Sequence, residues 1–302
     1  MTDVVTFGET MVSLRSDAPL TLPGPLTARM AGAESNVAIG LARLGHGVAW
    51  ASRVGDDTYG RLMVSVVRGE GVDTHVTIDP TRPTGLMVAA ARTPDVTSVT
   101  YYRAGSAASA IAVDDVTGLV ASRPRVIHVT GITAALSASA REAVEHAVRH
   151  AGDALVSLDV NHRARLWPAE EAGAVLRPLL DHVDLVIGSP EELVLLGGRT
   201  DLIARGIEVV EKRGSDGAAA FRGDEQVVMP ALRVTAVDPV GAGDAFTAGY
   251  LSALLDGEDL RGRLDRGVVL GAFAVSAKGD YEGLPYRSEL GLLGHSSGTT
   301  LR

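Results

Sequence analysis

The sequence predicts an α/β fold in which a mainly parallel sheet carries helices on both faces. Short runs rich in β-branched residues alternate with longer segments whose apolar residues recur at helical spacing, the pattern of repeated strand and helix units. Of the 302 residues, 46% are hydrophobic and 22% are charged, so the chain can bury a large core. It contains no cysteine, which excludes disulfides and thiolate metal sites. We expect one domain over residues 1–292 and a disordered polar tail over residues 293–302.

Through most of the chain, strands and helices are expected to alternate. The predicted strands cover residues 4–7, 48–54, 126–129, 155–158 and 185–187. The clearest helical segments that follow them cover residues 35–44, 58–67, 137–148 and 170–180. Beyond these, we expect strands at residues 209–212, 218–221, 226–229 and 233–237, then helices at residues 243–255 and 260–277.

Two stretches interrupt the alternation. Residues 20–29 are rich in proline, and residues 76–102 contain three short strand patterns (76–78, 85–91, 96–102) separated by proline turns, with no helix between them. A sheet this thin cannot bury a core of its own. We therefore expect a small β-sheet lid, formed from about residues 10–30 and 76–106, which caps a site or pairs with a second subunit to give a dimer or larger assembly.

The charge pattern excludes several classes of partner and chemistry. The net charge of −9 argues against a nucleic-acid partner, whose phosphates select basic surfaces. The chain has no apolar run of the roughly 18 residues that a membrane span needs and begins without a basic leader, so we expect a cytoplasmic protein without a membrane partner. It has only two lysines, and because Lys212 is followed by Arg213 and Lys278 by Gly279, there is no Walker A phosphate loop.

The strongest chemical signal lies at residues 236–246. There a strand pattern ends, a turn of small residues follows, and a helix begins near Gly243. Glycines in a first helical turn leave backbone N–H groups uncovered, and these groups with the helix dipole bind phosphate. Asp244 stands beside this site, where it can accept the proton of an attacking hydroxyl during phosphoryl transfer. The alternative is an ordinary helix-capping aspartate; a dinucleotide-binding turn is disfavoured because Phe246 replaces its third glycine.

These residues resemble a known family. Asp238-Pro239-Val240-Gly241-Ala242-Gly243-Asp244 is similar to the Asp-Thr-x-Gly-Ala-Gly-Asp signature of the ribokinase-like (PfkB) carbohydrate kinases, with Pro239 in place of threonine. Three further elements appear in the family's order: Gly8-Glu9, Gly32-Ala33-Glu34-Ser35-Asn36-Val37-Ala38 and Val54-Gly55-Asp56-Asp57-Thr58-Tyr59-Gly60. The resemblance implies a doubly wound ribokinase-like fold and an ATP-dependent sugar kinase.

Within that family the sequence is most similar to the 2-keto-3-deoxygluconate kinases. The likeness rests on Tyr101-Tyr102-Arg103-Ala104-Gly105-Ser106-Ala107, His128-Val129-Thr130-Gly131-Ile132, Ser157-Leu158-Asp159-Val160-Asn161-His162-Arg163 and Gly279-Asp280-Tyr281-Glu282-Gly283-Leu284-Pro285-Tyr286-Arg287. Many ribose and fructose kinases have an aspartate where this chain has Ser13. The missing carboxylate suits an anionic substrate, because like charges in a closed site repel.

The resemblance also implies roles for individual residues. Asp244 is the expected general base, and Gly241, Ala242 and Gly243 form the expected anion hole. The substrate-binding set is Gly32, Ala33, Glu34, Ser35, Asn36, Met87, Tyr101, Arg103, Arg163, Asp244 and Asp280. Within it, Arg103 and Arg163 are the candidates to grip a carboxylate or phosphate, although either could be an ordinary surface arginine.

The implied nucleotide and metal sites complete the prediction. The nucleotide-binding set is Asn161, Ser189, Lys212, Arg213, Gly214, Ser215, Asp216, Gly217, Gly241, Ala242 and Gly243. Mg²⁺ is expected to act with ATP, and Glu192 to influence it indirectly through water; Ser189 replaces the asparagine of the family's Asn-x-x-Glu motif. A monovalent cation such as K⁺ is a further candidate near Asp238 and Pro239.

Three other functions stay open. The closest is a kinase for another sugar, such as fructose or ribose, on the same fold. The second is a sugar-binding regulator without turnover, against which the intact Gly-Ala-Gly-Asp sequence argues. The third is a nicotinamide-dependent oxidoreductase, which the absent glycine fingerprint disfavours.

Overall fold

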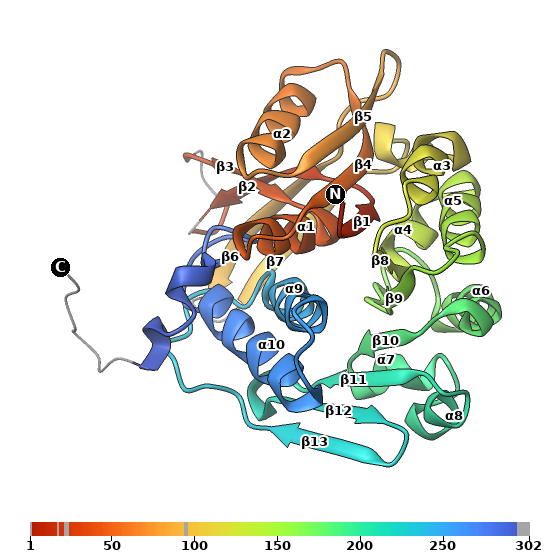
Figure 1. The fold of residues 1–302 in the computed structure, drawn as a ribbon. Coiled ribbons are helices and arrows are strands. Elements are labelled where there is room, and N and C mark those ends of the chain that lie inside the picture. The colour runs from red at the N-terminus through yellow and green to blue at the C-terminus, as the bar shows by residue number, and fades with distance from the viewer. Residues whose placement is uncertain (1, 17, 21–23, 94–95, 295–302) are drawn as a thin grey trace.

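The computed structural model describes residues 2–16, 18–20, 24–93 and 96–294, and its described part contains a nine-stranded sheet between two layers of helices (Figure 1). The strand order is β13-β12-β11-β10-β9-β8-β1-β4-β5. The strands from β11 to β5 in this order run parallel: β1 (Val4–Phe7), β4 (Val48–Gly55), β5 (Asp73–Asp79), β8 (Val126–Thr130), β9 (Leu155–Asp159), β10 (Leu185–Gly188) and β11 (Glu208–Lys212). β12 (Ala218–Arg222) and β13 (Glu225–Met229) add an antiparallel edge. The α/β prediction is confirmed.

Helices cover both faces of this sheet because its strands are apolar on both sides. In β1, Val5 and Phe7 face one apolar cluster while Val4 faces the other. The first cluster is covered by α3 (Val113–Ala121), α4 (Gly131–Leu136), α5 (Ala138–Arg149), α6 (Ala169–Leu176), α7 (Pro190–Val194) and α8 (Arg199–Ala204). The second is covered by α1 (Ala33–Arg43), α2 (Thr58–Gly69), α9 (Ala242–Leu255) and α10 (Leu260–Val275).

A second, four-stranded sheet has the order β3-β2-β6-β7 and is called the small sheet below. It consists of β2 (Met11–Ser16), β3 (Thr27–Ala31), β6 (Leu86–Thr93) and β7 (Val96–Tyr102). Among the described residues, its own apolar cluster holds four buried residues, Met11, Ala31, Met87 and Ala89. The predicted small β-sheet is therefore present, and its thin core makes it depend on contacts with the rest of the protein.

The structure corrects four details of the sequence prediction. The strand expected at residues 76–78 does not belong to the small sheet: it lies within β5, which pairs in parallel with β4 at the edge of the main sheet. Residues 233–237 form no strand, and the Val237 N–H instead donates to Val275 O at the end of α10, 2.6 Å away. The helix expected at 170–180 ends at Leu176 and continues as a 3₁₀ helix, Arg177–His182, because Pro178 lacks an amide hydrogen. Helices α3, α4, α7 and α8 had not been predicted.

Two remaining observations concern the predicted tail and membrane-spanning helices. Of the predicted tail, residues 295–302 lie outside the described residues. No helix in the described part of the chain is both long and apolar enough to cross a bilayer.

Candidate active site

The site is built around the first turn of α9. Its N-cap, Gly241, has a φ of 76°, a left-handed conformation that glycine adopts without strain. A Cβ at this position would lie 2.1 Å from the backbone oxygen of Asp280, so only glycine fits. In the described part of the chain, no side chain caps the N-terminal end of this helix. The backbone N–H groups of the first turn can therefore bind an anion, as the Gly241-Ala242-Gly243 sequence led us to expect.

Asp244 lies in this first turn, next to the candidate anion hole. The Nδ2 of Asn36, in the first turn of α1, donates a 2.8 Å hydrogen bond to its Oδ2. Burial raises the pKa of Asp244 to about 6, while the Asn36 hydrogen bond and the Lys212 charge oppose that rise. The carboxylate is thus mostly ionised at neutral pH and basic enough to take a proton.

Asp280 is the second carboxyl group of the site. It is 6% exposed, and burial raises its pKa to about 7, opposed by the nearby charge of Arg15 and a hydrogen bond from Asn36. Asn36 thus lies between Asp244 and Asp280. Arg15, on β2 of the small sheet, also forms an ion pair with Asp238. Sequence reasoning missed Arg15, although it lies two residues after Ser13 and so on the same face of its strand.

Lys212 brings a positive charge to the start of α9. Its Nζ is 2.6 Å from Asp159 Oδ2, which also accepts a 3.0 Å hydrogen bond from Thr247 Oγ1. The same Nζ lies 3.4 Å from the position that a Cβ on Gly243 would occupy. A parallel sheet brings the carboxyl ends of β9 and β11 together, which explains how Asp159 and Lys212 meet at this edge.

The turn after Lys212 has the form expected of the predicted nucleotide-binding segment. Gly214 and Gly217 have φ values of 57° and 94°, and a Cβ on Gly217 would lie 2.0 Å from the backbone oxygen of Met229. Arg213 forms an ion pair with Glu211, a carboxylate that it shares with Arg199. Ser215 and Asp216 are exposed. Asn161, after β9, is buried and has a φ of 39°.

The two arginines predicted to grip the substrate have different surroundings. Arg103 forms an ion pair with the buried Glu9, whose other oxygen accepts a 2.6 Å hydrogen bond from Ser106 Oγ. Tyr101 lies beside Arg103, with its ring centroid 5.7 Å from the guanidinium carbon. Arg163 is exposed, donates to the backbone oxygen of His162 at 3.2 Å, and lowers the pKa of Asp244 by its charge. Its charge is thus the more available of the two.

Residues 32–36 do not all face the site. Gly32 precedes α1, and Ser35 Oγ donates to its backbone oxygen at 3.0 Å. Glu34, predicted to bind substrate, is fully buried and accepts hydrogen bonds from Thr130 Oγ1 (2.6 Å) and Thr133 Oγ1 (2.5 Å). Burial raises its pKa to about 7. Its carboxyl group is therefore held by hydroxyl groups from the end of β8 and from α4. Met87 is likewise buried, inside the small-sheet cluster, and Ala33 is half-buried in the first turn of α1.

The surroundings of Glu192 fit a metal ion whose ligands are mainly nucleotide phosphates and water. One Glu192 oxygen accepts from the Ser189 N–H and the other from the His162 N–H, each at 2.8 Å. Among the described residues, no group of three or more histidine or acidic side chains could hold a metal ion. Mg²⁺ bound by nucleotide phosphates and water, with Glu192 reaching it through water, fits this donor set. At the proposed monovalent-cation position, the Asp238 carboxylate is paired with Arg15.

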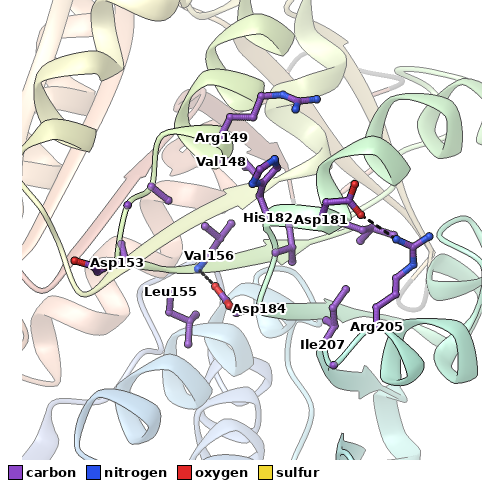
Figure 2. A pocket seen from close by; sticks show the side chains of 16 residues that line it. Val148, Arg149, Asp153, Leu155, Val156, Asp181, His182, Asp184, Arg205 and Ile207 are labelled. Atoms are coloured by element: carbon purple, nitrogen blue, oxygen red, sulfur yellow. Dashed lines mark hydrogen bonds and ion pairs between the residues drawn. The ribbon is translucent and has the colours of Figure 1, made fainter.

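A hollow of about 740 Å³ lies elsewhere on the protein (Figure 2). It is lined by residues at the amino ends of β9, β10 and β11, including Leu155, Asp184 and Ile207. Figure 2 shows the Asp184 carboxylate accepting a hydrogen bond from the Val156 N–H (2.8 Å), and Arg205 pairing with Asp181 (3.1 Å). Because Asp159 and Lys212 lie at the opposite, carboxyl ends of these strands, this hollow is separate from the candidate active site.

Comparison with known proteins agrees with this geometry. The sequence pattern of the group described as "pfkB family carbohydrate kinase" matches residues 1–287. The chain belongs to this family. It is an enzyme of the sugar kinase type, and the glycine turn and aspartate at the start of α9 stay the candidate active site.

Curated relatives of this carbohydrate kinase carry related names. The 2-dehydro-3-deoxygluconokinase of Thermoproteus tenax is 38% identical, with 94% of this chain and 92% of the relative covered. The 2-dehydro-3-deoxygluconokinase of Bacillus subtilis is 35% identical, with 95% and 94% covered. The 2-dehydro-3-deoxygalactonokinase of Haloferax volcanii is 31% identical, with 92% of each chain covered.

Solved structures of similar proteins share the fold. A PfkB protein from Polaromonas sp. JS666 is 38% identical and superposes with a TM-score of 0.84, covering 96% of this chain and 99% of its own. A sugar kinase from Pyrococcus horikoshii, solved in complex with ATP, is 25% identical with a TM-score of 0.84, covering 96% and 97%. The ribokinase-like fold expected from the sequence is therefore confirmed.

Proposed function

We propose that this kinase transfers the γ-phosphoryl group of ATP to the terminal hydroxyl of 2-keto-3-deoxygluconate, giving the 6-phosphate and ADP. The observation that carries the proposal is the position of Asp244, hydrogen-bonded to Asn36 beside an uncapped, glycine-containing helix start. Two relatives that are 38% and 35% identical over most of their length are named for this substrate, which is also called 2-dehydro-3-deoxygluconate.

Asp244 acts as the general base. With its Oδ2 occupied by Asn36, its Oδ1 accepts the proton of the substrate hydroxyl as the hydroxyl oxygen attacks the γ-phosphorus. The bond between that phosphorus and the β,γ-bridging oxygen breaks, and ADP leaves with the electron pair. A pKa of about 6 lets Asp244 be ionised before the reaction and still accept a proton during it.

The start of α9 stabilises the charge on the transferred group. Backbone N–H groups of the first turn point toward the position that the phosphate oxygens reach, and Lys212 adds an ammonium group beside Gly243. Mg²⁺, bound with ATP, neutralises charge on the nucleotide phosphates. The turn from Arg213 to Gly217 borders the nucleotide, and Asn161 and Ser189 follow two strands that end at the same edge of the sheet.

The substrate is held between the main sheet and the small sheet. Asp280, Tyr101 and the residues around Gly32 contact its hydroxyl groups, and Arg163 and Arg103 attract its carboxylate. The small sheet closes over the site as a lid and excludes water, which limits wasteful hydrolysis of ATP.

The test is a substrate panel with purified enzyme, ATP and Mg²⁺. We expect the highest kcat/KM with 2-keto-3-deoxygluconate, followed by its galactonate epimer, the substrate named for the Haloferax relative. Equal or higher kcat/KM with fructose or ribose would support the second candidate, a neutral-sugar kinase. Failure to consume ATP with any sugar would instead indicate a sugar-binding regulator.

We also propose that the enzyme is a cytoplasmic homo-oligomer that associates through the small sheet. The supporting observation is β7, an edge strand with exposed Val96 (54%) and Tyr102 (62%). A dimer mass in light scattering, lost in a Val96→Asp/Tyr102→Asp variant, would support this; a monomeric wild-type enzyme would refute it.

A further inference from the structure

Arg15 connects the small sheet to the loops that shape the active site. It lies in β2, and its side chain is only 15% exposed. Nη1 forms an ion pair with Asp238, Nη2 lies 3.5 Å from Asp280 Oδ1, and Nε donates to Ser13 Oγ at 3.3 Å. One guanidinium group therefore faces two carboxylates that are far apart in the sequence.

Both carboxylates belong to the backbone around the anion hole. Asp238 lies three residues before Gly241, and its oxygens accept from the N–H groups of Val240 (3.1 Å) and Gly279 (3.3 Å). The backbone oxygen of Asp280 packs directly against Gly241. The conformation of the 238–241 turn thus depends on Asp238 and on the segment that contains Asp280.

The charges explain why a cation is needed there. Asp238, Asp280 and Asp244 would repel one another if all were ionised without a compensating charge. Around Asp280, the groups that influence its charge are Arg15 from β2, Asp244 from α9, Glu282 from its own loop and Asn36 from α1. Of these four, Arg15 alone is positively charged.

We infer that Arg15 is a positioning residue for phosphoryl transfer: by holding Asp238 and Asp280 together, it fixes the turn that presents the α9 N–H groups to the phosphate. This inference rests on the proposed function of the α9 start. It assigns the small sheet a part in organising the anion hole, in addition to covering the substrate.

A second ion pair provides a matched control. Arg29, on β3 of the same sheet, pairs with Glu282 at 2.6 Å, in the loop that also contains Asp280. This pair likewise attaches the small sheet to the 279–284 segment, but it touches neither Asp238 nor Asp280. If only the attachment of the small sheet to the 279–284 segment matters for turnover, Arg29→Gln and Arg15→Gln will lower kcat by similar factors.

The experiment compares Arg15→Gln, Arg15→Lys and Arg29→Gln in the full-length enzyme, after circular dichroism has shown that each is folded. For Arg15→Gln we expect kcat to fall at least about 30-fold while KM for the sugar changes less than about threefold, the pattern of a defect in the transition state. Arg15→Lys should recover only part of kcat, because it keeps the positive charge but one ammonium group cannot bridge both carboxylates. Arg29→Gln should keep kcat within about threefold of wild type.

Two further measurements distinguish the positioning of the 238–241 turn by Arg15 from a simple attachment of the small sheet to the 279–284 segment. Because Arg15 lowers the pKa of Asp280, Arg15→Gln should raise the pH at which the Asp280 carboxyl group titrates in NMR spectra of the folded enzyme, whereas Arg29→Gln should not. Amide hydrogen exchange in a peptide covering residues 236–246 should be faster in Arg15→Gln only. Unchanged exchange, or equal kinetic losses in the two Gln variants, would overturn the inference. The exchange measurement needs no turnover, so it remains decisive if the proposed substrate is wrong.

Discussion

Replacing Asp244 by asparagine tests the proposed chemistry directly. The substitution keeps the shape of the side chain, and its amide oxygen can still accept the hydrogen bond from Asn36 Nδ2. What it removes is the group that takes the proton from the substrate hydroxyl. Loss of a general base typically costs about 10²–10⁴-fold, so we expect kcat to fall by at least about 10²-fold with KM nearly unchanged.

The same variant should be more stable than the wild type at neutral pH. The pKa of Asp244 is raised from 3.8 to about 6, so the folded protein binds this proton more tightly than the unfolded chain does. Stability is therefore lost as pH rises from about 4 to 6, and the loss is complete above the folded pKa. A shift of this size corresponds to an upper limit of about 3 kcal/mol. Asp244→Asn removes this penalty, so its Tm should exceed that of wild type at pH 8 and converge with it near pH 4.

The assay couples ADP formation to NADH oxidation, with Asp114→Asn as the control. Asp114 is an exposed carboxylate in the first turn of α3, so the control makes the same chemical change at another helix start. Wild type should lose kcat/KM as pH falls through about 6, where Asp244 is protonated, and Asp244→Asn should lack this limb. Near-normal turnover in Asp244→Asn, or a loss equal to that of the control, would refute the role of Asp244.

Three more substitutions test the surroundings of the base. Gly241→Ala should lower both Tm and kcat, because the added Cβ would lie 2.1 Å from the backbone oxygen of Asp280. Gly271→Ala is the control and should lower neither, because the atom nearest to its added Cβ is 3.7 Å away. Thermal melts and the same assay measure both effects. Lys212→Gln, whose amide can still donate to Asp159, should lower kcat/KM for ATP at least about tenfold by loss of a charge at the phosphate; unchanged kinetics would exclude that contact. Glu34→Gln should flatten the fall of Tm between pH 5 and 8, since the raised pKa of Glu34, about 7, makes the folded wild type lose stability over that interval; parallel Tm curves would contradict this.

The parts of the site that the sequence predicted are those with local causes. A turn of small residues followed by Asp244 requires only its own backbone conformation, and the left-handed Gly241 meets that requirement. Sequence order and spacing were sufficient for these features.

The features that the sequence did not predict depend on contacts between distant segments. Arg15 and Asp238 are brought together only when the small sheet meets the start of α9, so no local pattern marks their ion pair. Glu34 lies in the motif at residues 32–36 that was predicted to bind substrate, but its carboxyl group accepts hydrogen bonds from Thr130 and Thr133, which are distant in sequence. The strand at residues 76–78 was assigned to the small β insertion, yet it is part of β5 and pairs in parallel with β4, a partner that its own sequence does not indicate.

The charges of the site divide between organising residues and residues that can meet a substrate. Glu9 neutralises Arg103, and Asp238 with Asp280 neutralises Arg15, so these arginines fix protein segments and contribute little net charge. Lys212 is paired with Asp159, but it lies against the helix start where phosphate is expected. Arg163 is exposed and pairs only weakly through a backbone oxygen, while its charge reaches Asp244. In a protein of net charge −9, we therefore expect Arg163 to attract the carboxylate of an anionic sugar more strongly than Arg103 does.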